Sequence, residues 1–173
     1  MNGKQWESLF EGFSQRKQAK DARTESLREL ASWYDEQTQL VMTLVREVIS
    51  ERAAAFEERA GVHIDVQWPS HPPINVGPDG PFMSFMCLRI PEREVHLYSH
   101  RVGHGPPMIH FVVVRDRMEA RRERLIGRSG CRIERREGGG FLLQGVQDGQ
   151  NESTTLSVDD LAYRAFALLL GEL

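Results

Sequence analysis

The sequence predicts an α+β domain: an antiparallel sheet of five to six strands, with helices packed on one face and a long N-terminal helix. Three observations lead to this class. Apolar residues recur at helical spacing over residues 24–60, short apolar runs bounded by Gly and Pro follow between 62 and 146, and an apolar helical pattern closes the chain. We therefore expect a helical N-terminal extension over residues 1–61 and the α+β domain over residues 62–173.

The composition is that of an ordinary globular protein. Of the 173 residues, 40% are hydrophobic and 27% charged, and the formal net charge is −3. A chain without a basic surplus does not favour nucleic acid as its main partner. No apolar run predicts a membrane span, and the N-terminus lacks the apolar core of a signal peptide. Two cysteines on separate predicted strands, Cys87 and Cys131, favour a reduced, cytoplasmic protein, and no motif indicates a cofactor.

A short amphipathic helix is expected at the N-terminus. Trp6, Leu9, Phe10 and Phe13 are spaced i, i+3, i+4 and i+7, which places them on one helical stripe. This stripe either packs on its own domain or docks on a partner or a membrane surface. The polar residues 14–22 that follow form a hinge or continue the helix.

A long helix is expected over residues 24–60, and Gly61 is a suitable stop. Such a helix is about 55 Å long at 1.5 Å per residue, whereas a domain of this size has a radius of gyration of roughly 15–16 Å. Part of the helix must therefore break, project or pair with another chain. A heptad-like spacing makes pairing into a homodimer the favoured interpretation, and the residues that carry it are Leu27, Leu30, Tyr34, Val41, Leu44 and Val48.

The rest of the chain predicts strands and two further helices. A charged pattern marks residues 131–137 as an edge strand, residues 148–155 are expected to be a polar loop, and residues 117–126 a short helix. Ser157 and Asp160 form a capping-box pattern before an apolar terminal helix. The expected strands are 62–68, 82–90, 94–101, 108–115, 131–137 and 141–146.

Four of the six histidines lie between residues 94 and 116. His96, Tyr98 and His100 share one face of a strand, and His110 joins them if the next strand pairs in even register. The opposite face, with residues such as Ile109, is expected to be core. The histidine face is either an amphipathic recognition surface or the site of a small metal- or ligand-binding enzyme using His96, His100 and His110. No carboxylate is expected near enough to complete a ligand set.

The segment Arg115–Arg136 is rich in arginine. It predicts either a basic surface for nucleic acid or a solvated face with local ion pairs. The second interpretation is favoured, because acidic residues are interleaved and no aromatic platform accompanies the arginines.

The predicted order of elements is a long helix, three strands preceded by an extra one, a helix, two strands and a helix. Over residues 24–170 this order resembles the type III secretion chaperone family. The resemblance implies a bacterial homodimer whose surface grooves hold an extended part of a partner polypeptide.

We therefore expect a non-enzymatic, chaperone-like adaptor that acts as a cytoplasmic homodimer and holds a protein or peptide partner on a sheet or helix surface. The metal- or ligand-binding enzyme and the nucleic-acid-binding protein are the alternatives. Exposed aromatic and apolar side chains suit a contact surface, and the predicted contact residues are Trp6, Phe10, Phe13, Met86, His96, Tyr98 and His110.

Overall fold

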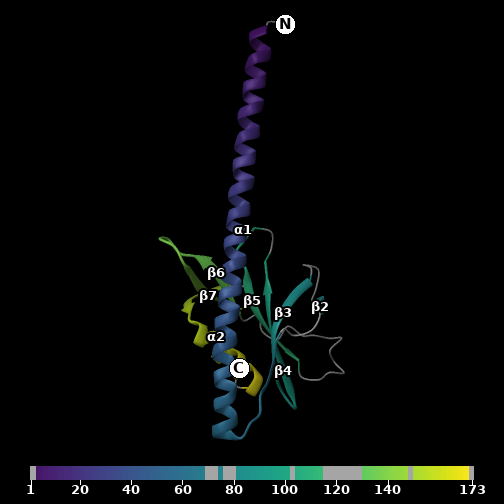
Figure 1. Ribbon diagram of the computed structural model, residues 1–173, viewed down its shortest axis with the longest axis vertical. Helices are drawn as coiled ribbons and strands as arrows, with labels where there is room; N and C mark the ends of the chain where they lie inside the picture. Colours follow the sequence, from purple (N-terminus) through teal and green to yellow (C-terminus); the bar gives the residue numbers. More distant parts are fainter. Residues whose placement is uncertain are drawn as a thin grey trace.

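The computed structural model of the chain (Figure 1) describes residues 3–68, 74–75, 81–101, 104–114, 130–147 and 150–171. The helix expected over residues 117–126 lies outside these ranges. Within them the elements in chain order are α1 Gly3–Ala60, β1 Asp65–Gln67, β2 Ile74–Asn75, β3 Pro81–Ile90, β4 Arg93–His100, β5 Met108–Val114, β6 Gly130–Arg135, β7 Phe141–Gln147, β8 Gln150–Leu156 and α2 Val158–Leu170.

The described strands form an antiparallel sheet in the order β1-β3-β4-β5-β6-β7-β8, and the short β2 pairs with the start of β3. The α+β class and the long N-terminal helix are confirmed, but the sheet exceeds the expected five to six strands. The polar loop predicted over residues 148–155 is wrong, because β8 begins at Gln150 and pairs with β7. The prediction that residues 131–137 form an edge strand is also wrong, because β6 pairs with β5 on one side and with β7 on the other.

Helices α1 and α2 cover the same face of the sheet, and the core lies between the two helices and that face. Residues of β4 and β5 that face the helices are directly paired, as Val95 with Val113 and Leu97 with Phe111. Ile109 belongs to the same core. The even register of β4 and β5 is confirmed, since Tyr98 pairs with His110 on the opposite face.

The hairpin between β3 and β4 has a two-residue loop, since Ile90 pairs with Arg93. This register continues along both strands, so that Cys87 pairs with His96 and Met86 with Leu97, and it shifts only beyond Met86, between Ser84 and Met86. The hairpin register places Met86 beside Leu97 in the core, fully buried. The expectation that Met86 shares a face with His96 is therefore wrong, and Cys87 holds that position.

Helix α1 is continuous from Gly3 to Ala60, so the polar residues 14–22 are helix and not a hinge. At 1.5 Å per residue its 58 residues span about 87 Å. Figure 1 shows its N-terminal half extending away from the sheet while the other half crosses the core. The buried side chains recur at three- and four-residue steps that fit one face of a straight helix, namely Tyr34, Thr38, Val41, Met42, Val45, Ile49 and Ala53.

This packing changes the meaning of the predicted heptad pattern. Tyr34 and Val41, two of the expected seam residues, are buried against the chain's own sheet. They are therefore not free to form a seam with a second chain. Of the outcomes expected for an overlong helix, the structure shows projection and no break, and pairing with another chain stays a prediction.

The ends of the helices follow their sequence signals. Gly61 follows α1 with φ of 65°, and its N–H donates to the carbonyl of Glu57 at 3.1 Å. At the start of α2, the Ser157 hydroxyl accepts from the N–H of Asp160, and the Asp160 carboxylate accepts in return from the N–H of Ser157. The predicted capping box is confirmed. The predicted packing of the terminal helix on the sheet is confirmed as well.

Candidate functional site

The N-terminal part of α1 is the first candidate site. Residues 6–26 are exposed apart from a half-buried Gly12, and we call residues 3–26 the projecting segment. It ends near the point where the Arg101 guanidinium donates to the carbonyl of Ala31 at 2.9 Å and fastens α1 to the end of β4. We call its four large apolar residues the apolar stripe, namely Trp6, Leu9, Phe10 and Phe13. Each of these side chains exposes between 47% and 65% of its surface.

A cleft between α1 and α2 is the second candidate site. It has a volume of about 480 Å³, and the stacked rings of Phe56 and Phe166, 5.3 Å apart, lie against it. Arg52 and Asp159 form an exposed ion pair of 3.4 Å at its rim. An apolar floor with a polar edge suits an apolar side chain of a bound polypeptide.

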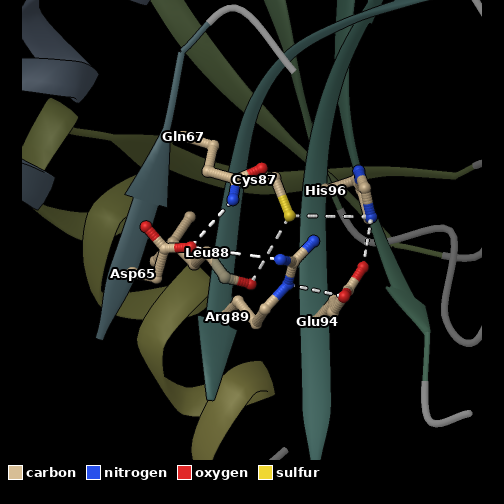
Figure 2. A network of polar contacts seen from close by, with 7 residues as sticks. All are labelled: Asp65, Gln67, Cys87, Leu88, Arg89, Glu94 and His96. Atoms are coloured by element: carbon tan, nitrogen blue, oxygen red, sulfur yellow. Dashed lines mark hydrogen bonds and ion pairs between the residues drawn. The ribbon is translucent and has the colours of Figure 1, made fainter. Parts of the chain in front are cut away.

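The third candidate site is a group of polar side chains on the sheet face opposite the helices (Figure 2). We call Cys87, Glu94 and His96 the polar cluster. Cys87 comes from β3, while Glu94 and His96 are two residues apart on β4 and therefore share a face. Cys87 Sγ is 3.7 Å from His96 Nε2, and a Glu94 carboxylate oxygen, Oε2, is 3.3 Å from the same nitrogen. Both side chains from β4 are only 14% exposed.

Neighbouring side chains fix the Glu94 carboxylate. Arg89 Nε lies 2.6 Å from Oε1 of Glu94, and Arg89 Nη1 lies 4.0 Å from Asp65. Asp65 in turn accepts a hydrogen bond of 2.8 Å from the Gln67 amide. Figure 2 shows these residues in a row across β1, β3 and β4. One oxygen of Glu94 is thus held by a guanidinium, and the other faces His96.

Burial lowers the pKa of His96 below its usual range, and the hydrogen bond and negative charge of Glu94 oppose this shift without reversing it. The imidazole is therefore neutral at pH 7. Its Nδ1 atom is buried and has no hydrogen-bond partner among the residues that the structure describes. The Nε2 atom carries the contacts to both Cys87 and Glu94.

The geometry does not suit nucleophilic catalysis. A cysteine nucleophile needs a histidine whose one nitrogen faces the thiol while the other is held by an acid. Here the thiol and the carboxylate face the same nitrogen. The three groups instead converge, with one donor atom of each lying within 4.8 Å of the others. Sulfur, nitrogen and oxygen donors that converge in this way are able to hold a metal ion.

The predicted histidine group is only partly brought together. The rings of His100 and His110 are 6.3 Å apart, and His96 stacks near Tyr98 at 5.9 Å. Only His96 belongs to the converging donor group found in the described part of the chain, where Cys87 and Glu94 stand in place of His100 and His110. The expectation that no carboxylate lies near the histidines is wrong.

Exposure separates the predicted contact residues into two groups. Met86 and Tyr98 are 0% and 1% exposed, so the expectation that they lie on a half-exposed recognition face is wrong. His96 and His110 are half-buried. The stripe residues Trp6, Phe10 and Phe13 are exposed, as a contact surface requires.

Most of the arginine-rich segment Arg115–Arg136 lies outside the described residues. Of the arginines that are described, Arg132 lies 3.8 Å from Glu134, and the Arg135 guanidinium lies over the Trp33 ring at 5.4 Å. The first contact is a local ion pair, as the favoured interpretation expects, whereas the second joins β6 to an aromatic ring of α1.

No family model, curated protein or solved structure matches this chain. Among the described residues, no helix has the length and apolar character needed to span a membrane.

Proposed function

We propose that this protein is a non-enzymatic, protein-binding adaptor that acts as a homodimer through the apolar stripe. The observation that carries the proposal is the exposure of Trp6, Leu9, Phe10 and Phe13 on a helix that projects beyond its own core. Isolated helices are marginally stable in water, because most helical stability in proteins comes from tertiary packing. The projecting segment, about 36 Å long, therefore needs a partner surface.

The size of the stripe favours a second copy as that surface. At roughly 1.5–3 kcal/mol for full burial of one large apolar side chain, the exposed fractions of the four residues contribute about 3–7 kcal/mol per copy. Association costs roughly 4–15 kcal/mol. The free energy gained by burying one stripe against a polar surface is near or below this cost. Two stripes that bury each other contribute about 7–14 kcal/mol. The net free energy of association is small, so we expect a dimer that forms at high protein concentration.

The charges on the projecting segment limit the overlap of the two copies. Arg16, Lys17, Lys20 and Arg23 follow the stripe, with Asp21 as the acidic residue among them. A parallel side-by-side pairing along the whole segment would bring these like charges together. An overlap confined to the stripe keeps them apart. The basic residues then stay available for an acidic partner polypeptide, and the cleft between α1 and α2 offers that partner an apolar seat.

Light scattering of the purified chain tests the dimer. The wild type is expected to show twice the 19.8 kDa mass of one chain at high micromolar concentration. A double variant, Phe10→Ser with Phe13→Ser, removes about 1–2 kcal/mol at each of four positions in the dimer, or about 4–8 kcal/mol in all. Dimerisation should weaken roughly 10³- to 10⁶-fold. Leu40→Ser is the matched control, because Leu40 is 46% exposed on the part of α1 that lies over the sheet.

A wild-type mass of 19.8 kDa at all concentrations would overturn the dimer. The adaptor role is tested by affinity capture from the native host with the wild type and both variants. A polypeptide retained by the wild type and by Leu40→Ser, but lost with the double variant, is the expected result. Equal recovery with all three would show that capture of the polypeptide does not need the dimer, and would count against an adaptor that acts as a homodimer.

A further inference from the structure

We propose that the polar cluster of Cys87, Glu94 and His96 binds a single divalent cation of the zinc class. The inference is independent of the dimer. It rests on three donor atoms of different elements that meet on the sheet face opposite the helices, each within 4.8 Å of the other two. Figure 2 shows the thiol and the carboxylate turned towards the same imidazole nitrogen.

The distances between the donors fit a tetrahedral ion. With bonds of about 2.3 Å to sulfur, 2.05 Å to nitrogen and 2.1 Å to oxygen, a tetrahedral zinc ion sets sulfur and nitrogen about 3.6 Å apart, and nitrogen and oxygen about 3.4 Å apart. The distances from His96 Nε2 to Cys87 Sγ and to Glu94 Oε2 are 3.7 Å and 3.3 Å. The remaining pair, Cys87 Sγ and the Glu94 oxygen, lies within 4.8 Å, against about 3.6 Å in a tetrahedral zinc site, so binding draws these two atoms together.

The donor set selects the kind of metal. Thiolate and imidazole ligands suit zinc and copper, whereas magnesium and calcium take oxygen ligands. The carboxylate completes a sulfur, nitrogen and oxygen set that zinc accepts. Binding replaces the proton of the Cys87 thiol, which passes to solvent, and the thiolate then forms the metal bond without any change in oxidation state.

Rigid elements hold the donors in place. Cys87 lies on β3 and the other two on β4, and both strands are flanked by further strands in the sheet. The contact of 2.6 Å between Arg89 Nε and Glu94 Oε1 fixes the carboxylate and leaves Oε2 for the ion. Partners behind the ligands commonly orient metal sites in this way. Three protein ligands leave a fourth position for water.

The alternative explanation is a hydrogen-bonded cluster in which the Nε2–H of His96 is shared between sulfur and oxygen. The two explanations differ in one measurable property. Only a metal site binds a cation stoichiometrically and with a sulfur ligand. Cobalt(II) reports both properties, because a cobalt–thiolate bond gives a charge-transfer band in the near ultraviolet and tetrahedral coordination gives strong visible bands.

The experiment titrates the full-length, reduced protein with cobalt(II) and then displaces the cobalt with zinc. We expect one cobalt per chain, both sets of bands, and their loss on addition of one equivalent of zinc. Cys87→Ser and His96→Gln should each weaken binding by at least about 100-fold, since loss of a partner behind a ligand already costs roughly 10–100-fold. Glu94→Gln should retain the thiolate band with weaker binding.

Two controls separate the cluster from other donors. Cys131→Ala leaves Cys87 as the one remaining thiol, so the charge-transfer band must persist. His110→Gln changes a histidine of the same face outside the cluster and should bind cobalt as the wild type does. Circular dichroism confirms that each variant is folded. Absence of stoichiometric cobalt binding would overturn the proposal, and so would binding that survives unchanged in folded Cys87→Ser and His96→Gln.

Discussion

The division of α1 into a packed half and a projecting half makes a sharp prediction about stability. Ile49 is fully buried in the core between α1, α2 and the sheet. Ile49→Ala removes buried carbon atoms and leaves a cavity, which costs about 2–5 kcal/mol in the free energy of unfolding. For a chain of this length that corresponds to a drop of roughly 4–20 °C in the melting temperature.

Urea unfolding followed by circular dichroism measures this loss at one fixed protein concentration. Leu40→Ala is the control, because Leu40 lies on the outer side of the same helix and is 46% exposed. Its change should stay within about 0.5 kcal/mol of the wild type. If Ile49→Ala were as stable as the Leu40 variant, α1 would not contribute to the core and the assignment of its two halves would be refuted.

Four further predictions concern the rest of the fold. Ser157→Ala should lower the free energy of unfolding by about 1 kcal/mol through loss of the α2 cap, measured by urea unfolding. Hydrogen bonds from the backbone and then the side chain of Ser157 lower the pKa of Asp160 below its usual range. The stability that this carboxylate contributes is therefore present above the pKa of the unfolded chain and is lost as pH falls through the folded-state pKa. Urea midpoints between pH 5 and 2 should therefore fall further for the wild type than for Asp160→Asn. Burial raises the pKa of Cys131 to about 12, so mass spectrometry should find this thiol alkylated by iodoacetamide far more slowly in the folded chain than in urea. Gly130→Ala should destabilise the fold by at least about 1–3 kcal/mol, because a Cβ atom there would overlap the backbone carbonyl oxygen of Ile109; a melting temperature equal to that of the wild type would contradict the close approach of β5 and β6.

The sequence predicts that α1 is helical but not which of its residues meet the sheet. A heptad stripe and a core stripe differ only by the slow drift between 3.5 and 3.6 residues per turn. Tyr34 and Val41 fit both patterns, and burial against the chain's own strands decides between them. The exposed stripe from Trp6 to Phe13 has the same spacing as a packed one, so its exposure could not be predicted from spacing.

The polar cluster shows why register matters for a site. Glu94 and His96 share a strand face by their two-residue spacing alone, and that signal was available in the sequence. Cys87 joins them only because the hairpin has a two-residue loop that pairs it with His96. Pro91 disfavours the turns most common in such loops, which left the register open. The apolar character of β3 does not show which of its residues face the core either, since both neighbours of Cys87, Met86 and Leu88, are apolar as well.

Strand β8 was missed because its residues are polar. Val146 and Gln147 pair with Asn151 and Gln150, which leaves only two residues between β7 and β8. Those residues are Asp-Gly in the sequence, a strong signal for a short hairpin. The turn residues here carried a signal for the hairpin that the hydrophobic pattern did not.

Crosslinking through Leu9 tests the central claim most directly. Leu9 lies near the centre of the apolar stripe, so in any symmetric pair that overlaps the stripes it is close to the two-fold axis. Under mild oxidation, Leu9→Cys is expected to give a covalent dimer at twice the 19.8 kDa of one chain, while Leu40→Cys stays monomeric. Failure of Leu9→Cys to crosslink, or equal crosslinking of both variants, would contradict a homodimer formed through the apolar stripe.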